Sequence, residues 1–84
     1  MNGRVYGINR NRGMVAIETE LHGFTIVELL NEADIEVGDE VSWESDTGVG
    51  SQTYSNVSKN RSMDVLVHNH LVSKSALRQQ LLMG

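Results

Sequence analysis

Short segments with strand-like alternation, separated by polar turns, recur along this chain and limit it to a small set of folds. In segment 14–19, Val15 and Ile17 fall on one face and Met14 and Ala16 on the other, as in a β-strand. The segments that we expect to form strands are 4–8, 14–19, 24–29, 40–44 and 52–58, and Val57 is the clearest core residue that we expect in the last of them. Short strands at regular spacing, with turn residues between them, indicate a small barrel or sandwich.

The chain is long enough for one hydrophobic core and too short for two. It has 84 residues, of which 39% are hydrophobic, and it contains no proline-rich linker and no internal repeat. It also contains no cysteine, which excludes disulfides and thiolate metal sites. The apolar core alone must therefore hold this single domain together.

The C-terminal part has a different character. Segment 63–68 reads as a sixth strand, and Ser73 or Ser75 is suited to cap a short helix over 76–83. Such a helix is marginal in water, so its Leu77 and Leu81 face must dock on the barrel or on another chain. We therefore divide the chain into a barrel, 1–60, and a strand and helix extension, 61–84, packed on the same domain.

Four stretches carry motifs in a defined order. They are Gly-Arg-Val-Tyr-Gly-Ile-Asn at 3–9, Arg-Gly-Met-Val-Ala-Ile at 12–17, Thr-Ile-Val-Glu-Leu at 25–29 and Gly-Asp-Glu-Val-Ser-Trp at 38–43. In order and spacing they resemble the opening strand, the two ribonucleoprotein motifs and the fourth strand of the cold-shock domain. The stretch 50–57 is similar to that family's ending, with one residue more. This resemblance, over roughly residues 3 to 59, implies an all-β, five-stranded OB-type β-barrel.

The departures from the family pattern fall on its ligand-binding face. In the family, outward aromatic residues of the first three strands stack against bases. Here the corresponding positions are Gly7, Met14, Ala16 and Ile26, and Glu28 stands where a histidine would be. The inward apolar set is kept, as Val5, Ile8, Val15, Ile17, Val27, Val41 and Trp43. The sequence thus retains the barrel and loses most of the stacking surface.

The aromatic residues are few, and we assign two of them to the core. Phe24 and Trp43 lie in strand-like segments and are expected to be buried, whereas Tyr6 is the one ring expected to remain on the stacking side. The sequence therefore offers at most one aromatic platform for a base.

The formal net charge of −4 argues against a broadly basic surface. All lysines and arginines lie outside 13–58, and nearly all acidic residues lie within it. An ordinary solvated acidic surface explains this distribution. If the fold brings the ends of the acidic block together, however, Arg10, Arg12, Lys59 and Arg61 would form one local basic patch.

The first function that we expect is weak, non-enzymatic binding of single-stranded RNA or DNA. Arg10, Arg12 and Asn9 would hold phosphates, and Tyr6 would stack on a base. The full set of candidate contacts is Tyr6, Asn9, Arg10, Arg12, Met14, Lys59 and Arg61.

The alternative is a protein-interaction module, as a monomer or a weak homodimer. Its interface would be the apolar face Met14, Ala16, Ile26 and Leu29. Under this alternative, Ile26→Asp should disrupt association without unfolding the barrel. A third possibility is that the C-terminal helix folds over this face and hides it.

Other signals have simpler explanations. His68 and His70 would share a strand face, near enough to His22 or Asp64 to suggest a metal, but a pair of partly exposed histidines is the interpretation that we adopt. The Gly-rich stretch 48–51 lacks the lysine and helix of a phosphate loop. No nucleophile is placed beside a base, so we expect no catalysis, no cofactor and no metal. Without a signal peptide or membrane-spanning run, we expect a cytoplasmic protein with no membrane association.

Overall fold

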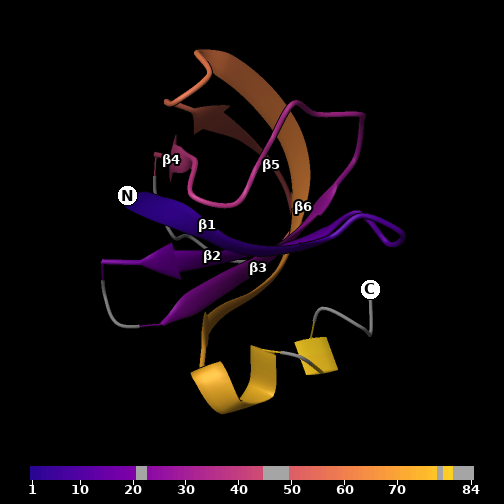
Figure 1. The fold of residues 1–84 in the computed structure, drawn as a ribbon, viewed down its shortest axis with the longest axis vertical. Coiled ribbons are helices and arrows are strands. Elements are labelled where there is room, and N and C mark those ends of the chain that lie inside the picture. The colour runs from indigo at the N-terminus through magenta and orange to yellow at the C-terminus, as the bar shows by residue number, and fades with distance from the viewer. Residues whose placement is uncertain (21–22, 45–49, 78, 81–84) are drawn as a thin grey trace.

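The computed structural model describes residues 1–20, 23–44, 50–77 and 79–80, and they form a closed β-barrel (Figure 1). Its elements are β1 (Asn2–Asn9), β2 (Met14–Thr19), β3 (Phe24–Leu29), β4 (Glu40–Ser42), β5 (Gly50–Asn56), β6 (Arg61–Val72) and the 3-10 helix η1 (Lys74–Ala76). Around the barrel the strands follow the order β1-β2-β3-β6-β5-β4. All neighbouring strands are antiparallel, including the closing pair β1 and β4. The predicted all-β, OB-type barrel is confirmed.

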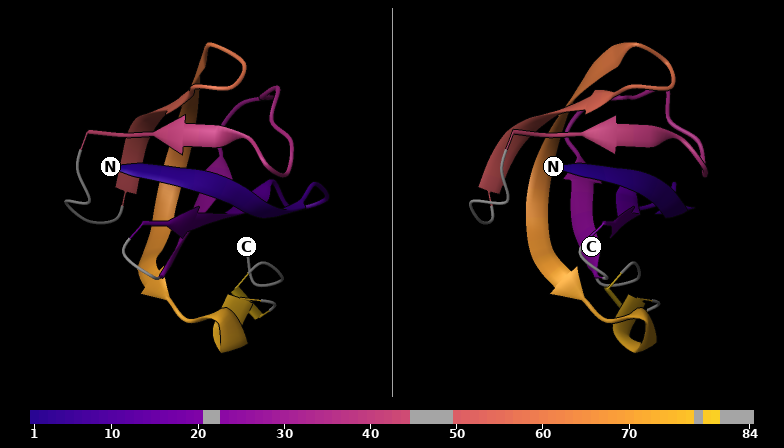
Figure 2. Two further views of the ribbon diagram at one scale, coloured as in Figure 1. Left: turned by 60° about the vertical axis from the view of Figure 1, so that its left-hand side comes forward. Right: turned by 90° about the vertical axis from the view of Figure 1, so that its left-hand side faces the viewer.

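The strand count differs from the expectation, because β6 is part of the barrel wall. We expected five strands and an extra strand after them, but the barrel closes with six. The twelve-residue β6 pairs with β3 on one side and with β5 on the other (Figure 2). Its alternating Met63, Val65 and Val67 are buried against the interior cluster. β6 thus pairs with β3 to close the barrel and contributes three side chains to the core.

The barrel interior holds the inward-facing set that strand alternation predicts. Val5, Val15, Ile17, Val27, Val41 and Trp43 are all buried there, together with Ile35, Tyr54 and the three β6 residues. Ile8 is partly buried and packs against this cluster. Successive side chains of a strand point to opposite faces, so one correct face assignment places every inward residue of that strand.

One core residue on the fifth strand was predicted wrongly. We expected Val57 inside, but β5 ends at Asn56 and the Val57 side chain is 52% exposed in the following turn. Tyr54 fills the interior instead, stacked on Trp43 with 4.6 Å between ring centroids and 6° between ring planes. Burial raises the pKa of Tyr54 to about 12. The turn ends at Asn60, whose φ of 56° lies in the left-handed region that asparagine tolerates.

The C-terminal segment covers the outer face of β2 and β3 (Figures 1 and 2). Leu77 is buried in a second apolar cluster with Met14, Ala16, Phe24 and Ile26. The predicted docking of Leu77 on the barrel is therefore confirmed. The predicted helix over 76–83 begins instead as η1, and its residues 78 and 81–83, Leu81 among them, lie outside the described part of the chain.

The close packing at Gly3 gives a first prediction. A Cβ atom placed on Gly3 would lie 2.5 Å from the Ile17 Cγ2 atom, 2.8 Å from the Glu18 carbonyl oxygen and 3.2 Å from the Trp43 ring. We therefore expect Gly3→Ala to lower the free energy of unfolding by about 2 kcal/mol, because the backbone oxygen cannot move aside cheaply. Urea denaturation followed by circular dichroism measures this. An unchanged midpoint would contradict the close approach.

Candidate functional site

The β1–β2 turn is fixed to the end of β3. Its backbone is closed by the Arg12 amide, which donates to the Asn9 carbonyl at 3.2 Å. Gly13 follows with a φ of 66°, which glycine adopts without strain. The Leu29 amide then donates to the Gly13 carbonyl at 2.8 Å. This turn therefore presents its exposed arginines, Arg10 and Arg12, from a defined position.

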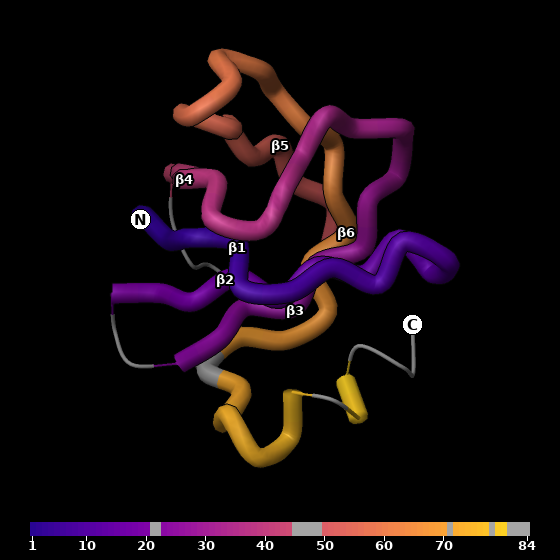
Figure 3. Tube along the Cα trace, viewed as in Figure 1, coloured from indigo at the N-terminus to yellow at the C-terminus, as the bar shows by residue number. Residues whose placement is uncertain are grey.

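After β3 the chain crosses the same end of the barrel, and we call residues 30–38 the mouth segment (Figure 3). Its far end is tied to β1, because the Gly38 amide donates to the Val5 carbonyl at 2.8 Å. Its middle is tied to the turn, because Arg10 Nη2 donates to the Ile35 carbonyl at 2.6 Å. Ile35 itself is buried in the interior cluster. The mouth segment and the β1–β2 turn thus form two connected walls at one end of the barrel.

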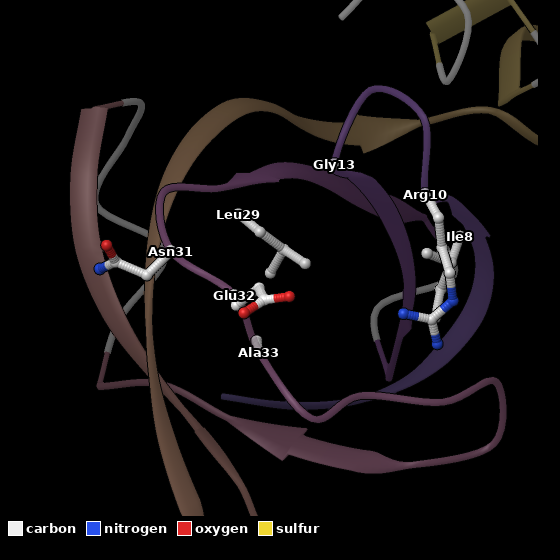
Figure 4. A pocket seen from close by; sticks show the side chains of 7 residues that line it. All are labelled: Ile8, Arg10, Gly13, Leu29, Asn31, Glu32 and Ala33. Carbon is white, nitrogen blue, oxygen red and sulfur yellow. The ribbon is translucent and has the colours of Figure 1, made fainter.

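Between these walls lies a cavity of about 410 Å³ (Figure 4). Its lining residues are Ile8, Arg10, Gly13, Leu29, Asn31, Glu32 and Ala33. Arg10 and Glu32 project from opposite walls, and Leu29 lies beside Glu32. Asn31 points away from the cavity, where its Nδ2 donates to Asp64 Oδ2 at 3.3 Å. Two opposite charges and an apolar floor therefore face this space.

The four predicted basic residues do not form one free basic patch. Lys59 and Arg10 reach consecutive residues of the mouth segment, but Lys59 Nζ is paired with Glu36 at 2.9 Å and lies 3.5 Å from Asp39. The hydrogen bond to Glu36, helped by the charge of Asp39, raises the pKa of Lys59. The acidic residues near Lys59 therefore offset its charge locally.

The other two cations remain accessible. Arg12 is exposed on the β1–β2 turn and Arg61 is exposed at the start of β6. Among the residues that the structure describes, no ion pair involves either guanidinium. Of these two, Arg12 is the one on the turn that borders the cavity.

Tyr6, the expected stacking residue, and Met14, another expected contact, do not line this cavity. Tyr6 is 43% exposed, meets Phe24 edge-on at 5.0 Å between ring centroids, and has Lys74 Nζ 5.8 Å from its ring centroid. Lys74 was not among the expected contacts, since only the return of the C-terminal segment brings it there. Met14 is 1% exposed beneath Leu77, so it offers no contact surface in this arrangement.

The expected apolar protein interface is not an exposed face. Met14, Ala16 and Ile26 do point outward from the barrel, but Leu77 covers them and each is at most 1% exposed. The assignment of Leu29 to this face was wrong, because Leu29 packs against the interior cluster. Ile26 and Leu29 are three residues apart on one strand and therefore point to opposite faces.

The two histidines of β6 have separate partners. His68 Nε2 contacts Glu28 Oε1 at 2.9 Å, and His70 Nδ1 contacts Thr25 Oγ1 at 3.1 Å. Asp64 instead contacts Asn31 and Thr53, and His22 lies outside the described residues. No group of three or more potential metal ligands occurs within the described ranges.

Of the residues that the sequence places at a nucleic-acid site, only Arg10 lines the cavity, and Asn9 and Arg12 lie beside it on the same turn. The sequence does not single out Glu32, Ala33 or the inward Leu29 for this site. The available signal was charge, because an acidic stretch follows β3 and a basic turn follows β1. In the described part of the chain, no helix has the length and apolar character needed to span a membrane. Comparison with family models, curated proteins and solved structures finds no match for this chain, so its function must be inferred from this geometry.

Proposed function

We propose that this protein is a non-enzymatic module that binds single-stranded nucleic acid weakly at one end of its barrel. The observation that carries the proposal is a cavity of about 410 Å³ with an apolar floor, which Arg10 lines and which Arg12 neighbours as an exposed residue of the same β1–β2 turn. Guanidinium groups bind phosphates, and an apolar cavity can take an unstacked base. The motifs that resemble the cold-shock domain are consistent with this class of ligand.

The proposed site is the barrel end rather than the outer sheet face. Leu77 covers the outer face of β2 and β3, so bases have no open platform there. The cavity walls, in contrast, are solvent-accessible, and Arg12 has no ion-pair partner among the described residues. Asn9 lies at the start of the same turn, where it would add a contact to the sugar-phosphate backbone of the bound nucleic acid.

The electrostatics of the chain predict low affinity and strong salt dependence. The net charge is −4, and Glu32 would repel a phosphate placed next to it. The protein can therefore neutralise few phosphates. Most of the binding free energy from phosphate contacts would come from Arg12 and from the N–H groups of Arg10 that are not bonded to Ile35. A cytoplasmic location, which the absence of cysteine fits, is part of this proposal.

The test is a titration with labelled short single strands at low and then moderate salt. We expect binding at low salt, and we expect Arg12→Gln to weaken it several-fold and to reduce the slope of log K against log salt by about 0.7, the value for one lost single-strand phosphate contact. Fluorescence anisotropy measures both quantities.

The matched control is Arg4→Gln, which removes the same charge elsewhere. Arg4 is exposed, lies 3.9 Å from Glu40, and lines a different hollow together with Glu18 and Glu20. We expect Arg4→Gln to change affinity much less than Arg12→Gln. Absence of binding at low salt would refute nucleic-acid binding, and equal effects of the two substitutions would refute the location.

A further inference from the structure

We propose that the cavity at the barrel end binds a single guanine base and reads two of its edges, one with Arg10 and the other with Glu32. This inference rests on the proposed function, since it names the base that the cavity would take from a bound strand. It starts from one geometric fact: Arg10 and Glu32 project into the cavity from opposite walls (Figure 4). The two side chains offer opposite hydrogen-bonding character, donors from one wall and acceptors from the other.

Arg10 is held in place by the protein and still has donors to offer. One of its N–H groups is used on the Ile35 carbonyl, with 2.6 Å between Nη2 and the oxygen. An arginine side chain carries five N–H donors in a rigid fork, so four remain. The guanine edge with O6 and N7 presents two adjacent acceptors, to which arginine binds in a bidentate manner. Arg10 is therefore suited to the acceptor edge of guanine.

Glu32 offers acceptors that the fold leaves unused. Among the described residues, no hydrogen bond or ion pair involves its carboxylate. A carboxylate accepts two parallel hydrogen bonds, and the guanine edge with N1–H and the 2-amino group presents two adjacent donors. Adenine and cytosine present one amino group beside an acceptor nitrogen there, and uracil and thymine present one N–H between two carbonyls. Only guanine matches both side chains at once.

The remaining lining residues fit a flat apolar surface. Ile8 and Leu29 are partly buried against the interior cluster, and Ala33 packs beside them. Asn31 does not compete for the base edges, because its amide is turned toward Asp64. The two walls are already joined by the hydrogen bond of 2.6 Å from Arg10 Nη2 to the Ile35 carbonyl. A site whose walls are fixed before binding loses less free energy to ordering.

The experiment compares short thymidine oligomers that carry one central guanine, adenine or cytosine. We expect the guanine oligomer to bind the full chain about tenfold more tightly than the other two, in the range of one good bidentate contact. We expect Glu32→Gln to remove this preference without weakening the binding of oligomers that lack guanine, because it deletes a negative charge. The matched control is Glu44→Gln, an exposed carboxylate after β4, which should leave the preference intact.

A second probe separates this inference from the proposed function. Guanosine monophosphate and adenosine monophosphate are titrated separately into isotope-labelled protein, and the amide chemical shifts of Ile8, Gly13 and Leu29 are followed by NMR. Amide shifts at these positions with the guanine nucleotide alone would support the cavity site. If no oligomer binds in the same conditions, the binding of single strands is refuted and the guanine site stands. Oligomer binding with equal affinity for all three bases, or with a preference unaffected by Glu32→Gln, would overturn the guanine site and leave strand binding standing.

Discussion

Replacing Ile26 with aspartate should destabilise the barrel by about 4 kcal/mol or more, because it places an unpaired charge between the barrel wall and its cover. Ile26 is fully buried and packs with Met14, Ala16, Phe24 and Leu77. The free energy of unfolding of a small domain is about 5–15 kcal/mol, so a loss of this size would remove a large fraction of it. Urea denaturation monitored by circular dichroism measures the loss.

This expectation replaces the one drawn from the sequence, in which Ile26→Asp would break an association and leave the barrel folded. The matched control is Val37→Asp, which introduces the same charge at a side chain that is 63% exposed. We expect Val37→Asp to change stability by no more than about 0.5 kcal/mol. If Ile26→Asp unfolds at the same urea concentration as the original chain, Ile26 is not buried in solution and the C-terminal segment does not cover it.

Strand alternation predicted the inward-facing residues of β2 correctly. Val15 and Ile17 were placed inward from their spacing alone, because side-chain direction in a strand is decided by neighbours one and two residues away. The same arithmetic, applied consistently, would have placed Leu29 inward, opposite to Ile26. The inward position of Leu29 is therefore predictable from the sequence.

The features that were missed depend on contacts between distant segments. Residues 63–68 read as a strand, but nothing local shows that β6 extends over Arg61–Val72 and lies between β3 and β5. The cavity has the same origin, since Glu32 faces Arg10 only because the mouth segment returns to the β1–β2 turn. Likewise, Lys59 reads as a free cation in the sequence and is an ion-pair partner of Glu36 in the fold.

A buried carboxylate holds the mouth segment in place. Asp39 is 8% exposed, and its Oδ2 atom accepts hydrogen bonds from the Glu36 amide and from Asn56 Nδ2, both at 2.9 Å. Lys59 Nζ lies 3.5 Å from the same oxygen. Burial by itself raises the pKa of Asp39, but the hydrogen bonds from Asn56 and Glu36 and the charge of Lys59 together outweigh it and lower the pKa below its ordinary value of 3.8. The folded chain therefore favours the ionised form.

We expect Asp39→Ala to cost about 2–4 kcal/mol near neutral pH, because two donors lose their acceptor in a largely buried site. The lowered pKa sets the direction of the pH dependence. The stabilisation is complete above the ordinary pKa of 3.8 and is lost as the pH falls through the lower folded-state value, since only the unfolded chain takes up the proton readily. The difference in unfolding free energy between the original chain and Asp39→Ala should therefore narrow in acid.

Urea denaturation of both proteins at about pH 7 and about pH 2.5 measures this narrowing. The control is Glu36→Gln, which removes a charge from the same cluster at a side chain that is 67% exposed and should cost less than about 1 kcal/mol. A difference in unfolding free energy of equal size at both pH values would show that the ionised Asp39 carboxylate does not stabilise the fold.

Because Asp39 anchors the segment that carries Glu32, Asp39→Ala should also weaken the guanine preference under conditions where the barrel remains folded. Wild-type guanine preference in the folded Asp39→Ala protein would show that the cavity wall is set by other contacts, the Arg10 to Ile35 hydrogen bond foremost.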